Sequence, residues 1–587
     1  MLYKLKGHFS TDENCLYDIL EDRKVEDIEK YLNPSEDCEL NPYDSDNIKE
    51  GIEMLMKHLR AKSRILFLVD ADCDGFTSSS ILWNYIKEIE PDADLHFITQ
   101  QGKKHGLEAK MDWLELNHFD LIITPDAGSY NKEQMERLIE LGSEILSADH
   151  HSPLLDEDGS IHIIDNPHAV IINNQLSEKY ENKSLCGAGV VYKFCQALDN
   201  ELGISKAEKF IDLVALGEIA DVMFQGTNET RYYIKKGLLN INNEGFKALL
   251  AAQDFSLKGK GKPPYAGLTP IDIAFYISPL INAVTRMGTE QENEVMFYAF
   301  TDPFKELQST KRGAKIGDIE LACEQLARIA GNIRQRQNKA IDKAMEIIVE
   351  RIEEQHLADN NVIVVEVEKD DSIPLTITGL LAQKVLSIYG KPCLIGRTGT
   401  DGFLRGSMRS SGNFASLPNF KEFLEESEMF DYVSGHFQAA GFSLEKTSLS
   451  TFITYVNSTL SFKDFENCYH VDYIFDANDS SIKTVGNIIG NHEDCFGNGV
   501  DEVKIVVKNI PTSSLFIMGA TKDSAKISYN GVDYVRFKDL DFIERAKEWN
   551  KIDIYGKINI NEYMGRKSLQ FFISDYEKSK EENRYEF

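Results

Sequence analysis

Acidic and imidazole side chains follow several short apolar runs in the first half of the chain. Three alternate aspartates come directly after RILFLV, one follows DLIIT, an Asp-His-His triplet follows SEILSA, and one more lies in ALGEIADVM. The eight residues are Asp70, Asp72, Asp74, Asp126, Asp149, His150, His151 and Asp221. Carboxylates crowded into one turn repel each other unless a cation neutralises them. Carboxylate and imidazole ligands without cysteine suit Mn²⁺ or Mg²⁺, so the pattern predicts a divalent metal site.

Strands are needed to bring these side chains together. Short β-rich runs (RILFLV, DLIIT, SEILSA, HIID and AVIIN) alternate with helical stretches such as 78–88 and 132–141. Strands that alternate with helices predict an α/β fold with a parallel sheet. Open parallel sheets bind their ligands beyond the carboxyl ends of the strands, so acids from separate strands can converge at one edge.

Each of these pieces also has an ordinary structural explanation. An aspartate after a strand commonly caps a helix or closes a turn, and for Asp126 alone that is the simpler interpretation. A single Asp-His-His triplet can be a surface loop. The ladder DADCDG looks like a calcium loop, but it lacks the glutamate that an EF-hand needs at its twelfth position. Four acid-bearing ends in one α/β segment are nevertheless hard to explain by turns alone.

Length and composition set the class of protein. The chain has 587 residues, which at roughly 150 residues per domain predicts about four domains. No apolar run reaches the roughly 18 residues of a membrane helix, so we expect no membrane contact. The N-terminus lacks the apolar stretch of a secretory signal, and nine single cysteines without a CxxC pair argue against a disulfide framework. We expect a cytoplasmic protein.

The chain divides into segments of different character. Residues 307–355 have helical apolar spacing and predict a long connecting helix, whereas the short alternating runs after residue 466 predict a small β-barrel or sandwich. Within the latter, Asn530-Gly531 predicts a hairpin turn. The expected parts are a helical extension (1–60), a catalytic α/β domain (61–235), a helical segment with the connecting helix (236–356), a second α/β domain (357–462) and a β-domain (463–587).

The charge of the chain restricts its partners. Its formal net charge is −31, from 64 basic and 95 acidic residues, which argues against coating nucleic acid through bulk charge. A nucleic acid strand can still enter a single internal groove. The acidic exterior also leaves the surface for protein contacts, for instance with a basic partner.

Four motifs in order resemble the DHH phosphoesterase superfamily: DADCDG, TPDAG, ADHH and GEIADVM. This resemblance implies a pair of divalent cations, Mn²⁺ or Mg²⁺. Their implied ligands are Asp70, Asp72, Asp74, Asp126, His150 and Asp221. It further implies that Asp149 orients the histidine pair and that His151 faces the substrate phosphate. Such a metal pair activates water for phosphodiester hydrolysis.

Other segments resemble the RecJ single-strand exonucleases within that superfamily. LCGAGVVYKFCQAL, SPLINAVTRMG, RGSMRSSG and SGHFQAAGFS follow the RecJ order, and the resemblance covers roughly residues 64–460. It implies a two-lobed DHH fold, with a parallel-sheet catalytic lobe and a smaller α/β DHH-associated lobe joined by a long helix. An OB-like β-barrel, which binds single strands through aromatic stacking and a basic groove, is expected at the C-terminus.

Substrate contacts are implied at five residues: Arg286, Ser407, Arg409, Gly435 and His436. The Gly/Ser-rich loop around Ser407 and Arg409 suits a terminal phosphate through its N–H groups, hydroxyls and guanidinium, and in RecJ it is associated with the 5′ end. Ordinary explanations stay open: Arg409 as an exposed loop residue, Arg286 as an ion-pair residue and His436 as a packed side chain.

The sequence departs from the family pattern at three places. Ser434 stands at the first position of the usual Gly-Gly-His, and Val284-Thr285 replaces a pair of small residues before Arg286. The segment 101–107 matches only loosely. Strand contacts by its basic side chains are therefore left open: Lys103, Lys104 and His105.

The activity implied by the resemblance is a metal-dependent 5′-to-3′ single-stranded-DNA exonuclease that releases 5′-mononucleotides in DNA repair or recombination. Cleavage of RNA and protein partners in repair or replication stay open. One alternative is a phosphodiesterase for short oligonucleotides or cyclic dinucleotides. Such enzymes usually consist of the two α/β lobes alone, so the N-terminal extension and the C-terminal β-domain argue against it. Another is a catalytically idle repair or replication scaffold, against which the complete ligand set argues.

Overall fold

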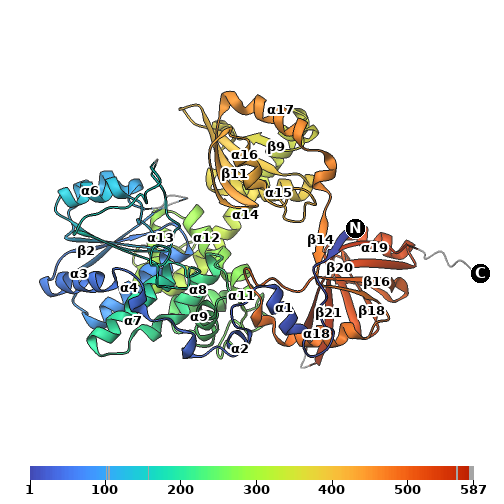
Figure 1. Ribbon diagram of the computed structural model, residues 1–587, viewed down its shortest axis with the longest axis horizontal. Coiled ribbons are helices and arrows are strands. Elements are labelled where there is room, and N and C mark those ends of the chain that lie inside the picture. Colours follow the sequence, from blue (N-terminus) through green and yellow to red (C-terminus); the bar gives the residue numbers. More distant parts are fainter. Residues whose placement is uncertain (101, 103–105, 157, 564–565, 581–587) are drawn as a thin grey trace, which may run out of the picture. The chain divides into compact units, whose positions relative to one another are not determined.

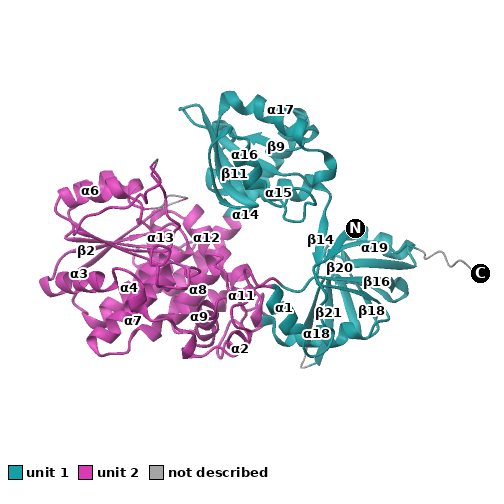
Figure 2. Cartoon of the chain, viewed as in Figure 1, with its two compact units in different colours: residues 1–22, 337–493, 502–587 teal, residues 23–336, 494–501 magenta. Residues whose placement is uncertain are grey.

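The computed structural model describes residues 1–100, 102, 106–156, 158–563 and 566–580 (Figure 1). The chain forms two compact units, shown in different colours in Figure 2. Unit 2 of Figure 2, called here the catalytic unit because it contains the predicted catalytic residues, comprises residues 23–336 and 494–501. Unit 1 of Figure 2, called here the second unit, comprises residues 1–22, 337–493 and 502–587. Each unit is described by itself below.

The catalytic unit is built on a five-stranded, all-parallel sheet in the order β3-β2-β4-β5-β6. Its strands are β2 (Ile65–Val69), β3 (Leu95–Thr99), β4 (Leu121–Pro125), β5 (Glu144–Asp149) and β6 (Ala169–Asn173). The chain passes from β2 to β3 on one side and then returns to β4 on the other. A topological switch point, where open α/β sheets bind ligands, therefore lies between β2 and β4. The predicted α/β fold is confirmed.

Helices cover both faces of this sheet. On one face the core of the unit packs against α3 (Ile48–Ala61), α4 (Cys73–Ile89) and α7 (Gly187–Leu202). The other face is covered by α5 (Met111–Leu116) and α6 (Lys132–Glu140). Figure 1 shows α6 across the sheet from α3, α4 and α7. The strands β2, β4 and β5 are buried on both faces, which explains why they read as continuous apolar runs rather than alternating ones.

Helical elements complete the catalytic unit. They are α2 (Ile28–Leu32), α8 (Ile211–Ala220), α9 (Asn228–Leu239), α10 (Glu244–Ala252), α11 (Pro270–Asp272), the π-helical turn η5 (Ile273–Ile277), α12 (Ser278–Met287) and α13 (Glu290–Thr301). The long helix α14 (Ala322–Glu354) contains the boundary between the two units. The prediction of one helix over 307–355 was wrong at its start, because β7 (Glu306–Gln308) and β8 (Ile319–Leu321) form a hairpin there.

The second unit contains the sheet of the DHH-associated lobe, in the order β12-β13-β11-β10-β9. Its strands are β9 (Ile363–Glu366), β10 (Cys393–Thr398), β11 (Phe403–Arg409), β12 (Phe430–His436) and β13 (Ala439–Glu445). Only β9 and β10 pair in parallel. The accompanying helices are α15 (Thr378–Tyr389), α16 (Phe420–Glu426) and α17 (Leu449–Thr459).

The C-terminal β-domain has a seven-stranded sheet in the order β15-β16-β20-β21-β19-β18-β17. The strands are β15 (Tyr473–Asp476), β16 (Ile505–Pro511), β17 (Leu515–Met518), β18 (Ser524–Tyr529), β19 (Val532–Arg536), β20 (Lys551–Tyr563) and β21 (Arg566–Lys578), with helices α18 (Ser481–Asn491) and α19 (Leu540–Glu548). The predicted hairpin is confirmed: Asn530 and Gly531 join β18 to β19, both with positive φ.

The N-terminal region differs from the helical extension expected over residues 1–60. It begins with β1 (Leu2–Leu5), which pairs in parallel with β14 (Cys468–Val471), and continues into α1 (Cys15–Asp22). Residues 1–22 belong to the second unit and the rest of this stretch to the catalytic unit. Pairing with a strand more than 460 residues away leaves no local signal. We keep the other domain boundaries as a proposal.

Within the described ranges, no helix has both the length and the apolar character required to cross a membrane.

Candidate active site

The carboxyl edge of the parallel sheet gathers the predicted side chains. β2, β4 and β5 are neighbours, so Asp70 after β2, Asp126 after β4 and Asp149 at the end of β5 meet at the same edge. Each of these three aspartates is only 1% exposed. Burying three carboxylates at one edge is unfavourable unless they are paired or bind a cation.

His150 lies at the centre of the cluster. Its Nε2 is 3.2 Å from Asp126 Oδ1, 3.4 Å from Asp221 Oδ2 and 3.8 Å from Asp74 Oδ2. Potential ligand atoms lie within 4.8 Å of one another in three overlapping groups: Asp126 with His150 and His151, Asp74 with His150 and Asp221, and Asp70 with Asp72 and Asp126. All six predicted ligands therefore belong to one connected cluster, called the carboxylate cluster below.

The electrostatics of the carboxylate cluster favour a bound cation. Burial, together with the neighbouring Asp74 and Asp72, raises the pKa of Asp126 well above its ordinary value, and the pKa of Asp221 is raised for the same reasons. Asp126 Oδ1 accepts no hydrogen bond from any described residue. A buried carboxylate oxygen without a donor, among like charges, is the kind of group that a divalent cation satisfies.

Backbone groups hold the first helix turn of the site in place. Asp74 accepts hydrogen bonds from the N–H groups of Gly187 (2.6 Å) and Ala188 (2.9 Å) at the start of α7. Asp72 caps α4 by accepting a hydrogen bond from Gly75 N at 2.9 Å. Asp72 is therefore both a helix cap and a member of the carboxylate cluster, and the two roles do not conflict.

Glycines permit the close approach of these elements. A Cβ atom on Gly187 would lie 2.5 Å from Asp126 Cβ, one on Gly217 2.7 Å from Asp74 Oδ1, and one on Gly75 2.6 Å from Asp70 Cβ. Real Cβ contacts are not this short, so any side chain at these positions would displace a member of the cluster.

The pKa values of the two histidines of the triplet are shifted in opposite directions. Burial lowers the pKa of His150, which favours the neutral imidazole that can bind a metal. Burial also opposes the charge of His151, but the hydrogen bond from its Nδ1 to Asp149 Oδ1 (2.7 Å) outweighs this and raises its pKa to about 9. Asp149 also accepts from Ser129 N at 3.1 Å. His151 is therefore a cation suited to a phosphate oxygen.

Sequence reasoning missed several residues that support the cluster. Asn173 Nδ2 donates to the His151 carbonyl at 3.1 Å, and Tyr130 OH donates to the same oxygen at 2.9 Å. The fully buried Glu218 accepts from Cys186 N at 3.2 Å, and Gln100 Nε2 donates to Asp70 at 3.3 Å. Two had a usable signal: Asn173 closes the strand AVIIN at the same edge, and Glu218 lies inside the motif GEIADVM.

Arg286, on α12, lies close enough to the carboxylate cluster to interact with it. Burial lowers the pKa of its guanidinium, whereas the charge of Asp72 raises it. A second arginine, Arg334 on α14, also acts on Arg286. Lys103, Lys104 and His105, whose roles the sequence left open, lie outside the described residues.

The remaining predicted contacts lie on the sheet of the DHH-associated lobe. Ser407 and Arg409 of β11 pair with Gly441 and Ala439 of β13, and β12 pairs Ser434 and His436 with the same two residues. Side chains in one cross-strand row point to the same face. Ser407, Arg409, Ser434 and His436 therefore share one face, separated only by small residues of β13; it is called the polar sheet face below.

Helix α15 begins beside the polar sheet face. Ser407 Oγ hydrogen-bonds Thr378 Oγ1 at 3.0 Å, and Arg409 Nη2 would lie 2.7 Å from a Cβ on Gly379. The guanidinium thus sits against the first turn of a helix, where N–H groups and the helix dipole favour anions. Gly435 has φ +132°, and a Cβ there would lie 2.8 Å from Ala439 O, so its part is to shape the backbone before His436.

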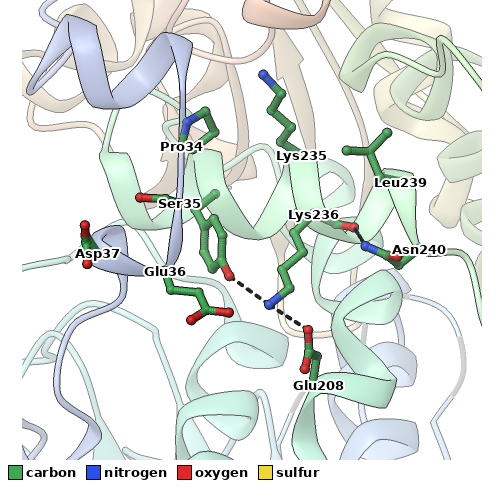
Figure 3. Close-up of a pocket in the computed structure, with 10 residues that line it drawn as sticks. Pro34, Ser35, Glu36, Asp37, Glu208, Lys235, Lys236, Leu239 and Asn240 are labelled. Atoms are coloured by element: carbon green, nitrogen blue, oxygen red, sulfur yellow. Dashed lines mark hydrogen bonds and ion pairs between the residues drawn. The ribbon is translucent and has the colours of Figure 1, made fainter.

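A hollow elsewhere in the catalytic unit shows a different character (Figure 3). It has a volume of about 610 Å³ and is lined by Pro34, Ser35, Glu36, Asp37, Glu208, Tyr232, Lys235, Lys236, Leu239 and Asn240. Lys236 Nζ donates to Tyr232 OH (2.8 Å) and pairs with Glu208 (2.7 Å). None of its described lining residues belongs to the carboxylate cluster.

Comparison with known proteins gives the same picture. The DHH family, N-terminal domain, matches residues 64–218, and the RecJ OB domain matches residues 471–575. The chain is 34% identical, over 98% of each chain, to YorK of the Bacillus subtilis SPbeta prophage, whose name proposes a single-strand DNA-specific exonuclease. It is 24% identical to the single-stranded-DNA-specific exonuclease RecJ of Bacillus subtilis, over 91% of this chain and 64% of that protein.

Solved structures agree on the fold. RecJ of Thermus thermophilus in complex with Mn²⁺ superposes with a TM-score of 0.69 at 20% identity, covering 94% of this chain and 74% of that chain. The same protein has also been solved with Mg²⁺. Given the extent of its identity to YorK, the chain belongs to the RecJ-like single-stranded-DNA exonucleases of the DHH phosphoesterase superfamily.

Proposed function

We propose that the protein is a 5′-to-3′ exonuclease that hydrolyses single-stranded DNA by a two-metal mechanism and releases 5′-mononucleotides. The single observation that carries the proposal is the carboxylate cluster, in which Asp74, Asp126 and Asp221 surround the neutral His150. An idle scaffold would have no reason to keep so many like charges buried together.

The cluster residues would hold two divalent cations, Mn²⁺ or Mg²⁺. When bound, such ions lower the pKa of a water nucleophile and neutralise charge on the attacked phosphate and the leaving oxygen. The donor set fits this use because it consists of carboxylates and one neutral imidazole, with Asp126 Oδ1 lacking a donor among the described residues. RecJ structures bound to Mn²⁺ and to Mg²⁺ support the choice of metal.

His151 and Asp149 would act together on the substrate. Asp149 fixes the imidazole of His151 through Nδ1 and keeps it charged, which leaves Nε2–H free of that bond to donate to a phosphate oxygen. Asp149 is itself held by Ser129 N. Arg286 would add a second positive charge to the phosphate beside Asp72.

The polar sheet face would determine polarity by holding the 5′-terminal phosphate. Arg409 supplies a guanidinium against the first turn of α15, and Ser407 and Thr378 supply hydroxyls beside it. His436 follows on the same face, next to the glycine that shapes its strand. Such a combination of charge, hydroxyls and helix N–H groups recognises a phosphate monoester better than an internal diester.

The wider role would be in DNA repair or recombination, with the C-terminal OB domain binding the same single strand. The RecJ OB domain match supports single-strand binding by this region. The proposal covers single-stranded DNA, and digestion of an RNA strand of the same sequence would extend it to RNA.

The experiment uses the full chain with strands labelled at one end. A 5′-labelled single strand should release labelled mononucleotide from the first turnover, whereas a 3′-labelled strand should shorten in a ladder. Both reactions should require Mn²⁺ or Mg²⁺ and stop with chelator, and a blunt duplex should resist. Digestion from the 3′ end, internal cuts or activity in chelator would refute the proposal. Faster cleavage of a dinucleotide than of a long strand would favour the short-oligonucleotide alternative.

A further inference from the structure

Two aromatic side chains are exposed on the π-helical turn η5, between α11 and α12. Phe275 is 70% exposed and Tyr276 39% exposed, whereas Ile273 and Ile277 of the same turn are fully buried. The turn is therefore packed firmly on one side and presents aromatic rings on the other. π-helical turns are rare and frequently mark functional sites.

Phe275 lies on the same stripe of the helical rod as Arg286. Phe275, Pro279, Asn282 and Arg286 are spaced at i, i+4, i+7 and i+11, and all four are at least partly exposed. The intervening positions Leu280, Ile281 and Val284 are buried. This spacing places all four residues on one face of the rod, with Phe275 at one end and the proposed phosphate contact at the other.

The length of this stripe matches a short piece of single strand. Eleven residues at 1.5 Å each span about 16 Å, which corresponds to a few nucleotides at about 3.4 Å per stacked base. A strand whose scissile phosphate lies at Arg286 and the carboxylate cluster would reach Phe275 within that distance.

A basic loop flanks the far end of the rod. Lys258, Lys260 and Lys262 lie between α10 and α11. Lys260 Nζ pairs with Asp272, directly before η5, at 2.9 Å, and Lys262 Nζ pairs with Asp254 at 2.8 Å. Three lysines within five residues stand out in a chain of net charge −31. Positive charge beside exposed aromatic rings is the combination that binds single strands without regard to sequence.

We propose that Phe275 is a stacking platform for one nucleobase of the bound single strand, a few nucleotides from the scissile phosphate. The inference rests on the proposed function, which puts a single strand at Arg286. The ring offers its face to any base, so the contact adds affinity but no sequence preference.

The test measures binding of a 5′-phosphorylated oligothymidylate to the full chain by fluorescence anisotropy, in chelator so that no cleavage occurs. Phe275→Ala should weaken binding about tenfold, Phe275→Leu by a similar factor, and Phe275→Trp should restore it, because stacking needs a π-face rather than apolar area alone. Phe304→Ala is the matched control, since Phe304 is 63% exposed in the same unit but outside the stripe, and it should bind as the wild type does.

An abasic nucleotide moved along the strand locates the contact. One position should weaken wild-type binding, and at that position Phe275→Ala should show no further loss. Hydrolysis of a dinucleotide, too short to reach Phe275, should keep its wild-type rate in Phe275→Ala. Because Phe275 is largely exposed, the variants should melt within a few degrees of the wild type.

The outcomes separate the two proposals. If the wild-type protein digests single strands but Phe275→Ala binds them equally well, or no abasic position is coupled to it, the stacking platform is wrong and the exonuclease assignment stands. An equal loss of binding affinity in Phe275→Ala and Phe304→Ala, or wild-type affinity in Phe275→Leu, would show that any apolar side chain serves. Either result would overturn the stacking proposal. If the wild type neither binds nor digests a single strand, the proposed function itself fails.

Discussion

The carboxylate cluster and the polar sheet face are built in opposite ways. In the cluster, acidic side chains from separate strand ends are buried and crowded, and added methyl groups on Gly187, Gly217 or Gly75 would collide with them. On the polar sheet face, the functional side chains come from two strands that pair with β13, and the space between them is left open by Gly441 and Ala439.

This difference separates two tasks. Buried like charges store unfavourable electrostatic energy that a cation relieves, so the cluster is suited to binding metal and doing chemistry. On the polar sheet face Ser434 and His436 are exposed and Arg409 is partly exposed, whereas the Ser407 hydroxyl is buried against Thr378. The face therefore presents charged and polar groups to a ligand and is suited to recognition. Damage to the first region should abolish catalysis, whereas damage to the second should change only affinity and end preference.

The largest effect is expected for Asp126→Asn. Loss of this carboxylate should lower the rate of single-strand digestion by about 10²- to 10³-fold, the scale of removing an electrostatic group at a reacting centre. In chelator the variant should unfold at the same or a higher temperature than the wild type, because the crowding that raises the pKa of Asp126 makes its charge unfavourable there. Activity assays and thermal melts check both statements.

Metal binding gives an independent reading of the same variant. Mn²⁺ at 100 times its dissociation constant should stabilise the wild type by about 2.7 kcal/mol, and it should stabilise Asp126→Asn much less. The control is Arg405→Ala, which changes a residue of the other unit that pairs with Ser443 rather than with Gly441. This variant should keep the full stabilisation by Mn²⁺. An unchanged metal shift in Asp126→Asn would separate this residue from the metal site.

A second, smaller effect is expected for Gly187→Ala. The new methyl group would lie within 2.6 Å of Asp126 Oδ1 and must displace it, while Asp74 loses the geometry of the Gly187 N–H bond. Changes in groups that position ligands typically cost 10- to 100-fold, so activity should fall by about that factor. Metal titration followed by melting should show weaker Mn²⁺ binding. Wild-type activity would mean that the crowding at Asp126 has no catalytic importance.

The third effect tests the polar sheet face. Arg409→Ala should raise KM for a 5′-phosphorylated strand about tenfold, the scale of one charge-assisted hydrogen bond, and should abolish the preference over a 5′-hydroxyl strand. The turnover number and the metal-induced melting shift should stay as in the wild type. Arg405→Ala, on the same strand but paired with Asp401 at 2.6 Å, is the matched control. A loss of turnover without a change in KM would place Arg409 in the chemistry instead.

The fold class and the convergence of the strand-end aspartates could be predicted because position along a strand carries geometry, whereas Asp221, at the end of helix α8, was assigned to the cluster by the family resemblance. Asp70, Asp126 and Asp149 each stand at the carboxyl end of a strand, and neighbouring parallel strands must end at the same edge. The order β2-β4-β5, which makes these strands neighbours, is supplied by the structure. Glu218 was missed despite its place in a motif, because a buried acid on a helix looks the same in sequence as an exposed one.

Features that depend on non-local pairing could not be predicted. That Ser407 and Ser434 share a row requires both β11 and β12 to pair with β13 in a particular register. Likewise, β1 pairs with β14, which lies more than 460 residues later in the sequence. The start of α14 was misplaced for a local reason: apolar spacing does not reveal the turns at Gly313 and Gly317, whose φ values are +85° and +96°.

The smallest effect is expected for Gly441→Ala, the counterpart of Gly187→Ala on the polar sheet face. A Cβ at Gly441 would have its nearest neighbour, Gly406 O, at 3.7 Å, which is an ordinary contact. Since glycine within a strand costs roughly 0.5–1 kcal/mol relative to alanine, the variant should be slightly more stable, and KM should change by less than about twofold. Denaturant unfolding and steady-state kinetics measure both. A large loss of affinity would show that the terminal nucleotide fills the space over Gly441, so that the face is as closely fitted to its ligand as the cluster is to its metals.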